Sequence, residues 1–370
     1  MVEIAIPRET LLYTAAAPFE AARYVSKLPS GHRSRRLHGH SFLAKIRATL
    51  PPRWASFPGA EVDELGQRLE HVVAALDYNS LNDQVPEPTD ENLARWIRDR
   101  IDLVEIDTIG VQSTIHQGAD LDGSQNAHIW RRYILESAHR LPNVPPGHQC
   151  GRMHGHGFQI IVHANQNIGS SDMGVDYDTL DALWAPLHVD LDRACLNDIA
   201  GLENPTSEMI SAWIWRRLKP DLPSLSWITV YETASCGANY DGNRYRIWKE
   251  MTLDSSLTLH NAPERDARRR IHGHTYTLRL HIDAPLDQVM GWTIDFGDVK
   301  ALFAPIFKRL DHQPLHELEG MAQPDTANVV RWTWNEARKT LPQVDRIDLY
   351  ERRGGGVILS TADAHIALPI

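Results

Sequence analysis

The sequence predicts an α+β fold built from three homologous units in tandem. The first observation is that the tripeptide His-Gly-His occurs three times, with steps of 116 and 118 residues between its first His residues, which are His38, His154 and His272. The second is that a Leu-Asp pair follows each tripeptide 39, 38 and 39 residues after that His, with its acid at Asp77, Asp192 and Asp311. A Pro-Thr or Asp-Thr before a Trp-rich segment, and a closing strand, recur in the same order.

These markers divide the chain into three units with limits at 1–123, 124–243 and 244–370. The joins fall near Gly123 and Asn243, in short stretches of turn-forming residues. A chain of 370 residues is long enough for two or three domains of ordinary size, so the division is physically reasonable.

Each unit shows the same series of elements. A strand precedes the His-Gly-His, as in "RRYILESAH", and an alternating or β-branched strand follows it, as in "GFQIIVHAN". An amphipathic helix comes next, as in "EVDELGQRLEHVVAAL". A second helix is expected after Thr89, Thr206 or Thr326, each a residue type that caps helices. A last strand ends the unit, which is therefore ββααβ with one more short strand.

The composition excludes several classes of protein. The net charge of −10 argues against a general nucleic-acid binder, and no apolar run is long enough to span a membrane. Residues 1–25 lack the pattern of a signal peptide, and three Cys make no disulfide framework, so we expect a cytoplasmic protein. Arginine clusters at 33–36 and 268–270 are either solvated loop charge or contacts for a small molecule that carries phosphate.

The middle unit has the pattern of a metal site. His154 and His156 lie two residues apart, so in a strand both imidazoles point to the same face. His139 ends the preceding strand, which should lie alongside. Three His with an open fourth position are typical of catalytic zinc, although imidazole also suits copper, iron and nickel. A hydrogen-bonded structural role is the alternative, and the threefold recurrence of the motif disfavours it.

Cys150 lies four residues before the first His of this motif. A thiol near a metal and cationic groups has a lowered pKa and can act as a base or a nucleophile. The alternative is a small buried hydrophobic residue.

The series His139, Cys150, His-Gly-His, Leu-Asp, "PTSE" and "YET" resembles the motifs of the 6-pyruvoyl-tetrahydropterin synthase and 6-carboxy-tetrahydropterin synthase family, and the resemblance covers the chain as three fused copies. It implies the tunnelling fold (T-fold), in which each unit has a four-stranded antiparallel sheet and two helices, and three units close a twelve-stranded barrel. One chain would form this pseudo-trimeric ring alone, which removes exposed sheet edges. A homodimer of two stacked rings is a further expectation.

The resemblance also implies a zinc-dependent lyase that acts on 7,8-dihydroneopterin triphosphate in pterin or deazapurine (queuosine) biosynthesis. In that family three His hold zinc, a Cys moves protons with an Asp-His pair from the neighbouring subunit, and a Glu holds the pterin. Zinc polarises the substrate side chain while triphosphate leaves. The 6-carboxy branch is favoured, and the pyruvoyl branch stays open.

Carried over residue by residue, the resemblance leaves no unit complete. The middle unit has the metal set, the thiol and a glutamate, at His139, His154, His156, Cys150 and Glu232, but Arg193 stands where the family has the His of the pair. The last unit has the pair, a glutamate and candidates for a second zinc, at Asp311, His312, Glu351, His260, His272 and His274, but Arg268 stands where the family has Cys. In the first unit Arg23, Ser34, Tyr78 and Gln112 replace family residues, so only His38 and His40 remain and no tight metal is expected there.

We therefore expect one composite active site between the middle and last units. It would combine zinc on the middle unit's three His and the thiol of Cys150 with Asp311 and His312, and Glu232 or Glu351 would bind the pterin edge through two parallel hydrogen bonds. Two alternatives remain: a family member repurposed for another pterin-like substrate, and a non-catalytic scaffold that binds zinc or pterin.

Overall fold

The computed structural model describes residues 9–166, 174–288 and 290–361. In this part of the chain twelve strands form one closed antiparallel sheet, and the short β3 (Asn79–Ser80) pairs parallel with β1 at its rim. The twelve strands are β1 (Thr10–Arg23), β2 (His38–Ala48), β4 (Ile106–Thr114), β5 (Gln117–Asp122), β6 (Ala127–His139), β7 (His154–Gln166), β8 (Leu225–Thr233), β9 (Cys236–Tyr240), β10 (Tyr245–Leu257), β11 (His272–Asp283), β12 (Val344–Arg352) and β13 (Gly355–Ser360).

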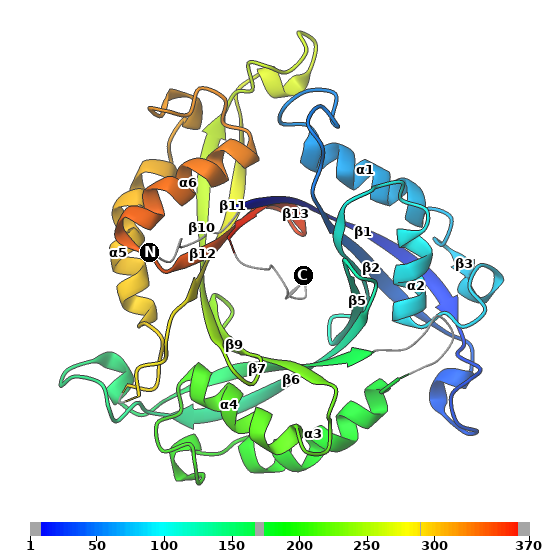
Figure 1. Cartoon of the computed structure of the whole chain (residues 1–370), viewed down its shortest axis with the longest axis vertical. Coiled ribbons are helices and arrows are strands. Elements are labelled where there is room, and N and C mark those ends of the chain that lie inside the picture. Colours follow the sequence, from blue (N-terminus) through cyan, green and yellow to red (C-terminus); the bar gives the residue numbers. More distant parts are fainter. Residues whose placement is uncertain (1–8, 167–173, 289, 362–370) are drawn as a thin grey trace, which may run out of the picture.

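The first and last strands close the ring. β13 pairs antiparallel with β1, from Thr10 opposite Ser360 to Thr14 opposite Gly356. Each unit supplies four consecutive strands, and its last strand pairs with the first strand of the next unit, as in β5 with β6 and β9 with β10. The predicted fold is confirmed: three T-fold units close a twelve-stranded barrel (Figure 1). The turns at Gly123 and Asn243 join neighbouring units, and we keep 1–123, 124–243 and 244–370 as the proposed limits.

Helices cover the outside of the barrel, two for each unit (Figure 1). The α-helices of the described residues are α1 (Glu61–Val73), α2 (Asp90–Arg98), α3 (Tyr177–Leu191), α4 (Ser207–Leu218), α5 (Phe296–Leu310) and α6 (Thr326–Thr340). Short 3₁₀ turns are η1 (Arg33–Arg35), η2 (Leu81–Asp83), η3 (Gln149–Gly151), η4 (Leu196–Asp198), η5 (Ala267–Arg269) and η6 (Leu315–Glu317).

Two of the three expected helix caps are confirmed. The Thr89 and Thr206 hydroxyls accept from the N–H groups of Asn92 and Met209. The third was wrong by one residue, because Asp325 caps α6 and Thr326 is its first residue. A carboxylate accepts a hydrogen bond from a free N–H at the start of a helix more strongly than a hydroxyl does. When Asp and Thr are adjacent, the Asp is therefore favoured as the N-cap.

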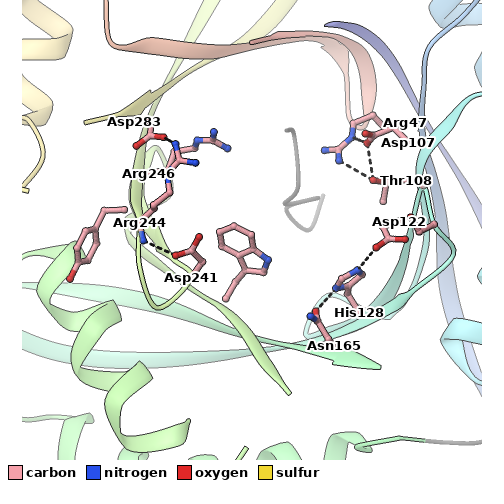
Figure 2. A pocket seen from close by; sticks show the side chains of 14 residues that line it. Arg47, Asp107, Thr108, Asp122, His128, Asn165, Asp241, Arg244, Arg246 and Asp283 are labelled. Atoms are coloured by element: carbon pink, nitrogen blue, oxygen red, sulfur yellow. Dashed lines mark hydrogen bonds and ion pairs between the residues drawn. The ribbon is translucent and has the colours of Figure 1, made fainter. Parts of the chain in front are cut away.

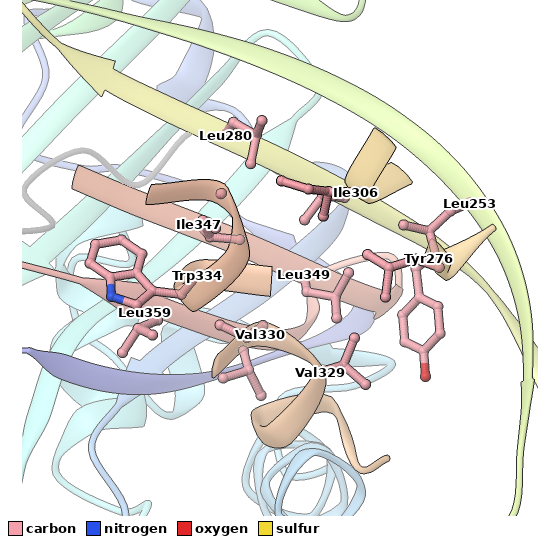
Figure 3. Close-up of a cluster of buried hydrophobic side chains, with 14 of the residues drawn as sticks. Leu253, Tyr276, Leu280, Ile306, Val329, Val330, Trp334, Ile347, Leu349 and Leu359 are labelled. Carbon is pink, nitrogen blue, oxygen red and sulfur yellow. The ribbon is translucent and has the colours of Figure 1, made fainter. Parts of the chain in front are cut away.

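Alternation along the strands produces two different layers. The side chains that point outward meet the helices in an apolar core, one for each unit, and Figure 3 shows the core of the last unit between β10–β13 and the helices α5 and α6. Its largest member, Trp334, is 2% exposed. Burying such a side chain contributes about 2–3 kcal/mol, so each helix pair is held to its sheet mainly by this layer.

The side chains that point inward line a charged lumen. Lys45 and Asp120 lie 2.8 Å apart and are both buried, and the aromatic residues Trp130, Tyr231 and Trp248 pack together on the same face. A pocket of about 580 Å³ opens at the barrel end away from the His-Gly-His motifs (Figure 2). The charged side chains of this pocket pair with each other, as in Arg47–Asp107 and Arg244–Asp283. We therefore do not take this pocket as the candidate functional site.

Candidate metal centre and active site

Three imidazoles of the middle unit converge on the outer face of the barrel. His139 is the last residue of β6 and lies directly opposite His154, the first residue of β7. His156 lies on the same face of β7, two residues along, as the period of a strand requires. One ring nitrogen from each of the three lies within 4.8 Å of the others. The register of this one strand pair therefore assembles the predicted His set.

Backbone carbonyls orient two of the rings. Nδ1 of His139 lies 2.9 Å from the Pro205 carbonyl, and Nδ1 of His154 lies 2.8 Å from the Arg152 carbonyl. A ring whose Nδ1–H donates to a carbonyl presents the lone pair of Nε2, which is the usual outer support of a metal-binding His.

The site has unsatisfied nitrogen atoms where a metal would lie. Nε2 of His139 and Nε2 of His156 are buried and have no hydrogen-bond partner. Burial lowers the pKa of both imidazoles, so both stay neutral at ordinary pH, as metal ligands must. A buried lone pair without a partner is costly, and a bound cation would remove that cost. The residues present therefore fit zinc.

Cys150 lies in η3, beside these ligands. Its backbone N–H donates to Nδ1 of His148, 3.2 Å away, which caps the turn. The expected low pKa of the thiol is not found in the protein without metal: burial raises it, and the carboxylates of Glu232 and Asp295 add to the effect. Sequence reasoning counted the neighbouring cations and could not see that two acids face the sulfur.

Glu232, the residue before the last of β8, lies close to His156. Its Oε1 lies 3.7 Å from Nε2 of His156, and its Oε2 accepts a hydrogen bond of 2.8 Å from the Ser207 hydroxyl. Glu208, the next residue along α4, is buried, and its carboxylate accepts from the backbone N–H of Thr293 in the last unit. Burial raises the pKa of Glu208 to about 7.

A pocket of about 840 Å³ holds these groups and spans the junction of the middle and last units. The middle unit lines it with Cys150, His154, His156 and Glu232. The last unit adds groups that sequence reasoning missed, namely Lys249 of β10 and a segment before and within α5, with Trp292, Asp295, Phe296 and Lys300. These residues are not among the motifs that marked the repeats in the sequence, and the closure of the ring brings them to the pocket that His154 and His156 line.

The Asp-His pair is not part of this pocket within one chain. Asp311 and His312 follow the C-terminal end of α5, whereas the pocket lies at its N-terminal end. Oδ2 of Asp311 is 2.9 Å from Nδ1 of His312, and the side chain of His312 is 76% exposed. The expectation that one ring interface brings this pair to Cys150 is therefore not met by the geometry of a single chain.

The candidate ligands of a second zinc, His260, His272 and His274, do not come together in the described residues. β10 ends at Leu257, which pairs with His272 as His139 pairs with His154. His260 lies beyond the end of the strand and does not group with His272 and His274 among the described residues. In the sequence, His260 precedes His272 by 12 residues, whereas His139 precedes His154 by 15. This difference indicates that His260 lies three residues C-terminal to the position that matches His139.

In the first unit a buried ion pair lies where the middle unit has His139. Arg23 occupies the position of His139, and its guanidinium lies 2.7 Å from the carboxylate of Asp90, which is buried like Arg23. Asp90 also accepts from the hydroxyls of Ser113 and Tyr177. The sequence predicted that Gln112 stands where the middle unit has Glu232. The strand register shows that Ser113 occupies this position instead.

Glu351 occupies the matching position in the last unit, at the junction with the first. It interacts with the Thr326 hydroxyl, and burial raises its pKa to about 7. It does not line the pocket that contains His154, His156 and Glu232, so the two candidate glutamates lie at different junctions.

The chain is thus a T-fold protein, a closed barrel of three repeated β-β-α-α-β-β units with a three-His cluster beside one junction, and comparison with known proteins identifies its family. The family model "6-pyruvoyl tetrahydropterin synthase" matches residues 13–114, 128–243 and 246–361. The chain belongs to this family, as three copies in tandem.

The chain is 38% identical over 119 residues to a 6-carboxy-5,6,7,8-tetrahydropterin synthase of Synechocystis, a match that covers 30% of this chain and 91% of that protein. It is 32% identical over 92 residues to a dihydroneopterin monophosphate aldolase of Pyrococcus furiosus, covering 24% of this chain and 77% of that protein. A structure of Caenorhabditis elegans 6-pyruvoyl tetrahydropterin synthase matches with a TM-score of 0.27 and 14% identity, over 29% of this chain and 88% of that chain. No helix in the described residues is long and apolar enough to cross a membrane.

Proposed function

We propose that this chain is a zinc-dependent enzyme that converts 7,8-dihydroneopterin triphosphate to a 6-substituted tetrahydropterin with loss of triphosphate, as a 6-carboxy-tetrahydropterin synthase does. The observation that carries the proposal is the pocket between the middle and last units. It contains a thiol, a carboxylate and Nε2 of His156, which makes no hydrogen bond and belongs to one of three converging imidazoles. A cytoplasmic place in deazapurine biosynthesis fits this chemistry.

Each residue has a separate task in the proposal. His139, His154 and His156 hold zinc, which supplies electrophilic polarisation of the substrate's hydroxyl and carbonyl oxygens when bound. Glu232 accepts two parallel hydrogen bonds from the aminopyrimidinone edge of the pterin, and the Ser207 hydroxyl fixes its carboxylate. Cys150 carries a proton to and from the side-chain carbons of the substrate.

One assay tests the reaction and its branch. The zinc-loaded chain is incubated with 7,8-dihydroneopterin triphosphate, and released triphosphate and the three-carbon side chain are followed. Acetaldehyde identifies the 6-carboxy branch, and a pyruvoyl product identifies the other branch. Bound zinc without turnover would instead support a repurposed family member or a binding scaffold.

Cys150→Ser separates catalysis from binding. The substitution should lower kcat by about 10²–10⁴, the range for a positioned acid or base, and leave zinc stoichiometry unchanged. Normal turnover by this variant would remove Cys150 from the mechanism.

Asp311 and His312 remain part of the proposal through a second ring. His312 is exposed and Asp311 is half-buried. Asp311 accepts from the backbone N–H of Asp254, three residues before Leu257, just as Asp192 accepts from that of Glu136, three residues before His139. It therefore lies at the same end of the barrel as the three His. We propose that a homodimer of stacked rings brings the pair of one chain to the pocket of the other.

Mixing two inactive variants tests this arrangement. If the pair acts across the dimer, a Cys150→Ser chain and a His312→Ala chain should each be inactive, and an equimolar mixture should regain about a quarter of the activity. Inactive variants that stay inactive on mixing would show that the pair acts within its own chain. An active His312→Ala chain would show that the pair has no role.

A further inference from the structure

We infer that His148 is a positioning residue for the thiol of Cys150, because it ties the turn that carries this thiol to the neighbouring unit. His148 is the N-cap of η3, the short turn that contains Cys150. It belongs to the middle unit, whereas the carboxylate that it faces, Asp295, belongs to the last unit. All three residues line the pocket of about 840 Å³. The inference rests on the proposed function, because it assigns a residue that orients the proton carrier of the same site.

The two ring nitrogens of His148 face different units. Nδ1 accepts the backbone N–H of Cys150 at 3.2 Å, and Nε2 lies 3.5 Å from Oδ2 of Asp295. An imidazole that accepts at Nδ1 carries its proton on Nε2, so this N–H points at the carboxylate. One ring therefore links the thiol turn of the middle unit to the start of α5 in the last unit.

Asp295 is a fixed partner for this ring. Its other oxygen, Oδ1, caps α5 by accepting the backbone N–H groups of Gly297 and Asp298, at 2.6 and 3.2 Å. The side chains of His148 and Asp295 are 26% and 18% exposed, so water competes only partly for their contact. Because α5 holds the carboxylate, the contact sets the distance of the thiol turn from the last unit.

The middle unit holds the other side of the turn. The carbonyl of Cys150 accepts from the backbone N–H of Leu141 at 2.8 Å. The N–H of Cys150 is thus held through His148 and its carbonyl through Leu141, and the short backbone between them directs the thiol. Loss of the contact with Asp295 leaves the turn attached to its own unit alone.

The first unit has the same arrangement without a thiol. Nδ1 of His32 accepts the backbone N–H of Ser34 at 3.1 Å, and Nε2 lies 2.8 Å from Oδ2 of Asp178 in the middle unit. Ser34 stands where the middle unit has Cys150. The chain therefore contains a matched control, a His-Asp contact across a junction that positions no thiol.

The last unit keeps the cap and loses the His-Asp contact. Asp266 is the N-cap of η5, and its Oδ1 accepts the backbone N–H of Arg268 at 2.9 Å. The contact with the first unit is made instead by the guanidinium of Arg268, which lies 2.8 Å from Asp63. A short polar side chain is thus sufficient to cap this turn, and the added reach of His148 serves the contact across the junction.

Two substitutions break that contact from opposite sides and keep both caps. His148→Asn still offers Oδ1 to the N–H of Cys150 but is too short to reach Asp295. Asp295→Asn caps α5 through Oδ1 and presents an N–H donor to His148, which cannot accept at Nε2. Each should lower kcat for 7,8-dihydroneopterin triphosphate about 10- to 100-fold at unchanged KM, because a small displacement of a reacting group has this effect. The double variant should be no slower than either single variant.

His32→Asn is the matched control. It breaks the equivalent contact with Asp178 at the junction without a thiol and should leave kcat unchanged. Amide hydrogen exchange of the full chain without substrate is the second readout. His148→Asn and Asp295→Asn should speed exchange in residues 147–153, and His32→Asn should speed it in residues 31–37 only.

Four results have distinct meanings. Unchanged kcat in both His148→Asn and Asp295→Asn would overturn the inference, and so would an equal loss of kcat in His32→Asn, which would indicate a general effect of junction stability. Unchanged exchange of residues 147–153 in both variants would show that the middle unit alone holds the turn, which also overturns the inference. No turnover by the unmodified chain would reject the proposed function, and the exchange rates would still decide whether Asp295 orders the turn.

Discussion

Glu232 lies between the cluster of three imidazoles and α4, with Oε1 3.7 Å from Nε2 of His156 and Oε2 2.8 Å from the Ser207 hydroxyl. The hydroxyl of Ser207, the first residue of α4, therefore positions the carboxylate beside His156. A change in the charge of Glu232 should lower the affinity for the substrate more than the affinity for zinc, because the three imidazoles are the proposed protein ligands of the zinc.

Glu232→Gln should consequently reduce substrate affinity without loss of zinc. A single amide oxygen replaces a charged acceptor of two bonds, and hydrogen bonds to charged groups contribute about 1.5–3 kcal/mol, so Kd for dihydroneopterin should rise about 10- to 100-fold. Calorimetry on the zinc-loaded variant measures this, and Glu351→Gln at the other junction is the control. Equal effects of the two substitutions would contradict the assignment of Glu232.

The number of bound zinc ions should depend on which residue pairs with the first His of each His-Gly-His motif. A unit should bind zinc only when that residue is also a His. His139→Ala should abolish tight zinc binding and its effect on unfolding, which for a ligand at 100 times its Kd is about 2.7 kcal/mol. Leu257→His should add a third imidazole beside His272 and His274 and raise the stoichiometry from one to two. Elemental analysis after dialysis gives both values, and an unchanged stoichiometry in Leu257→His would mean that strand register alone does not define the site.

The buried carboxyl of Glu208 should make stability depend on pH. Its folded-state pKa is raised to about 7, above the ordinary value of 4.5, so the folded state binds the proton more tightly than the unfolded state. The contribution of Glu208 to the free energy of unfolding is therefore fully present below about pH 4.5 and is lost as pH rises through 7. Glu208→Gln should be more stable than the unmodified chain by about 2–4 kcal/mol at pH 8, and the difference should vanish near pH 4.5. Denaturant unfolding at both pH values tests it; a constant difference would contradict the shift.

Asp90 should matter for stability and not for catalysis. Asp90→Asn leaves the guanidinium of Arg23 buried without its counter-ion, which costs about 3–5 kcal/mol. Zinc stoichiometry and the Kd of the bound pterin should not change, since both belong to another junction. Arg23→Met combined with Asp90→Asn removes both charges and should recover most of the loss. Failure of that recovery would show that the hydroxyl bonds to Asp90, and not the ion pair, dominate.

Repetition made most of the fold predictable, because each weak strand or helix signal was read three times. The His set was predictable for a related reason: a strand fixes which residues share a face, so His139, His154 and His156 follow from register. The errors, at His260, Gln112 and Thr326, are shifts along a strand or cap, and only hydrogen-bond register resolves them. The far wall of the pocket, with Lys249 and Trp292, could not be predicted from a unit's own sequence, since it depends on which surfaces the closed ring brings together.

The pairing of Thr10–Thr14 with Gly356–Ser360 has a consequence for how the protein is made. On this edge the Thr10–Thr14 part of β1 has no partner until β13 has been synthesised, and for that whole interval the nascent chain carries an open sheet edge. The contact spans almost the entire chain, so its loop-closure entropy is the largest of any strand pair here. The final step of folding should thus be the joining of two ends of an already formed crescent, and this step should be the slowest and the most exposed to aggregation.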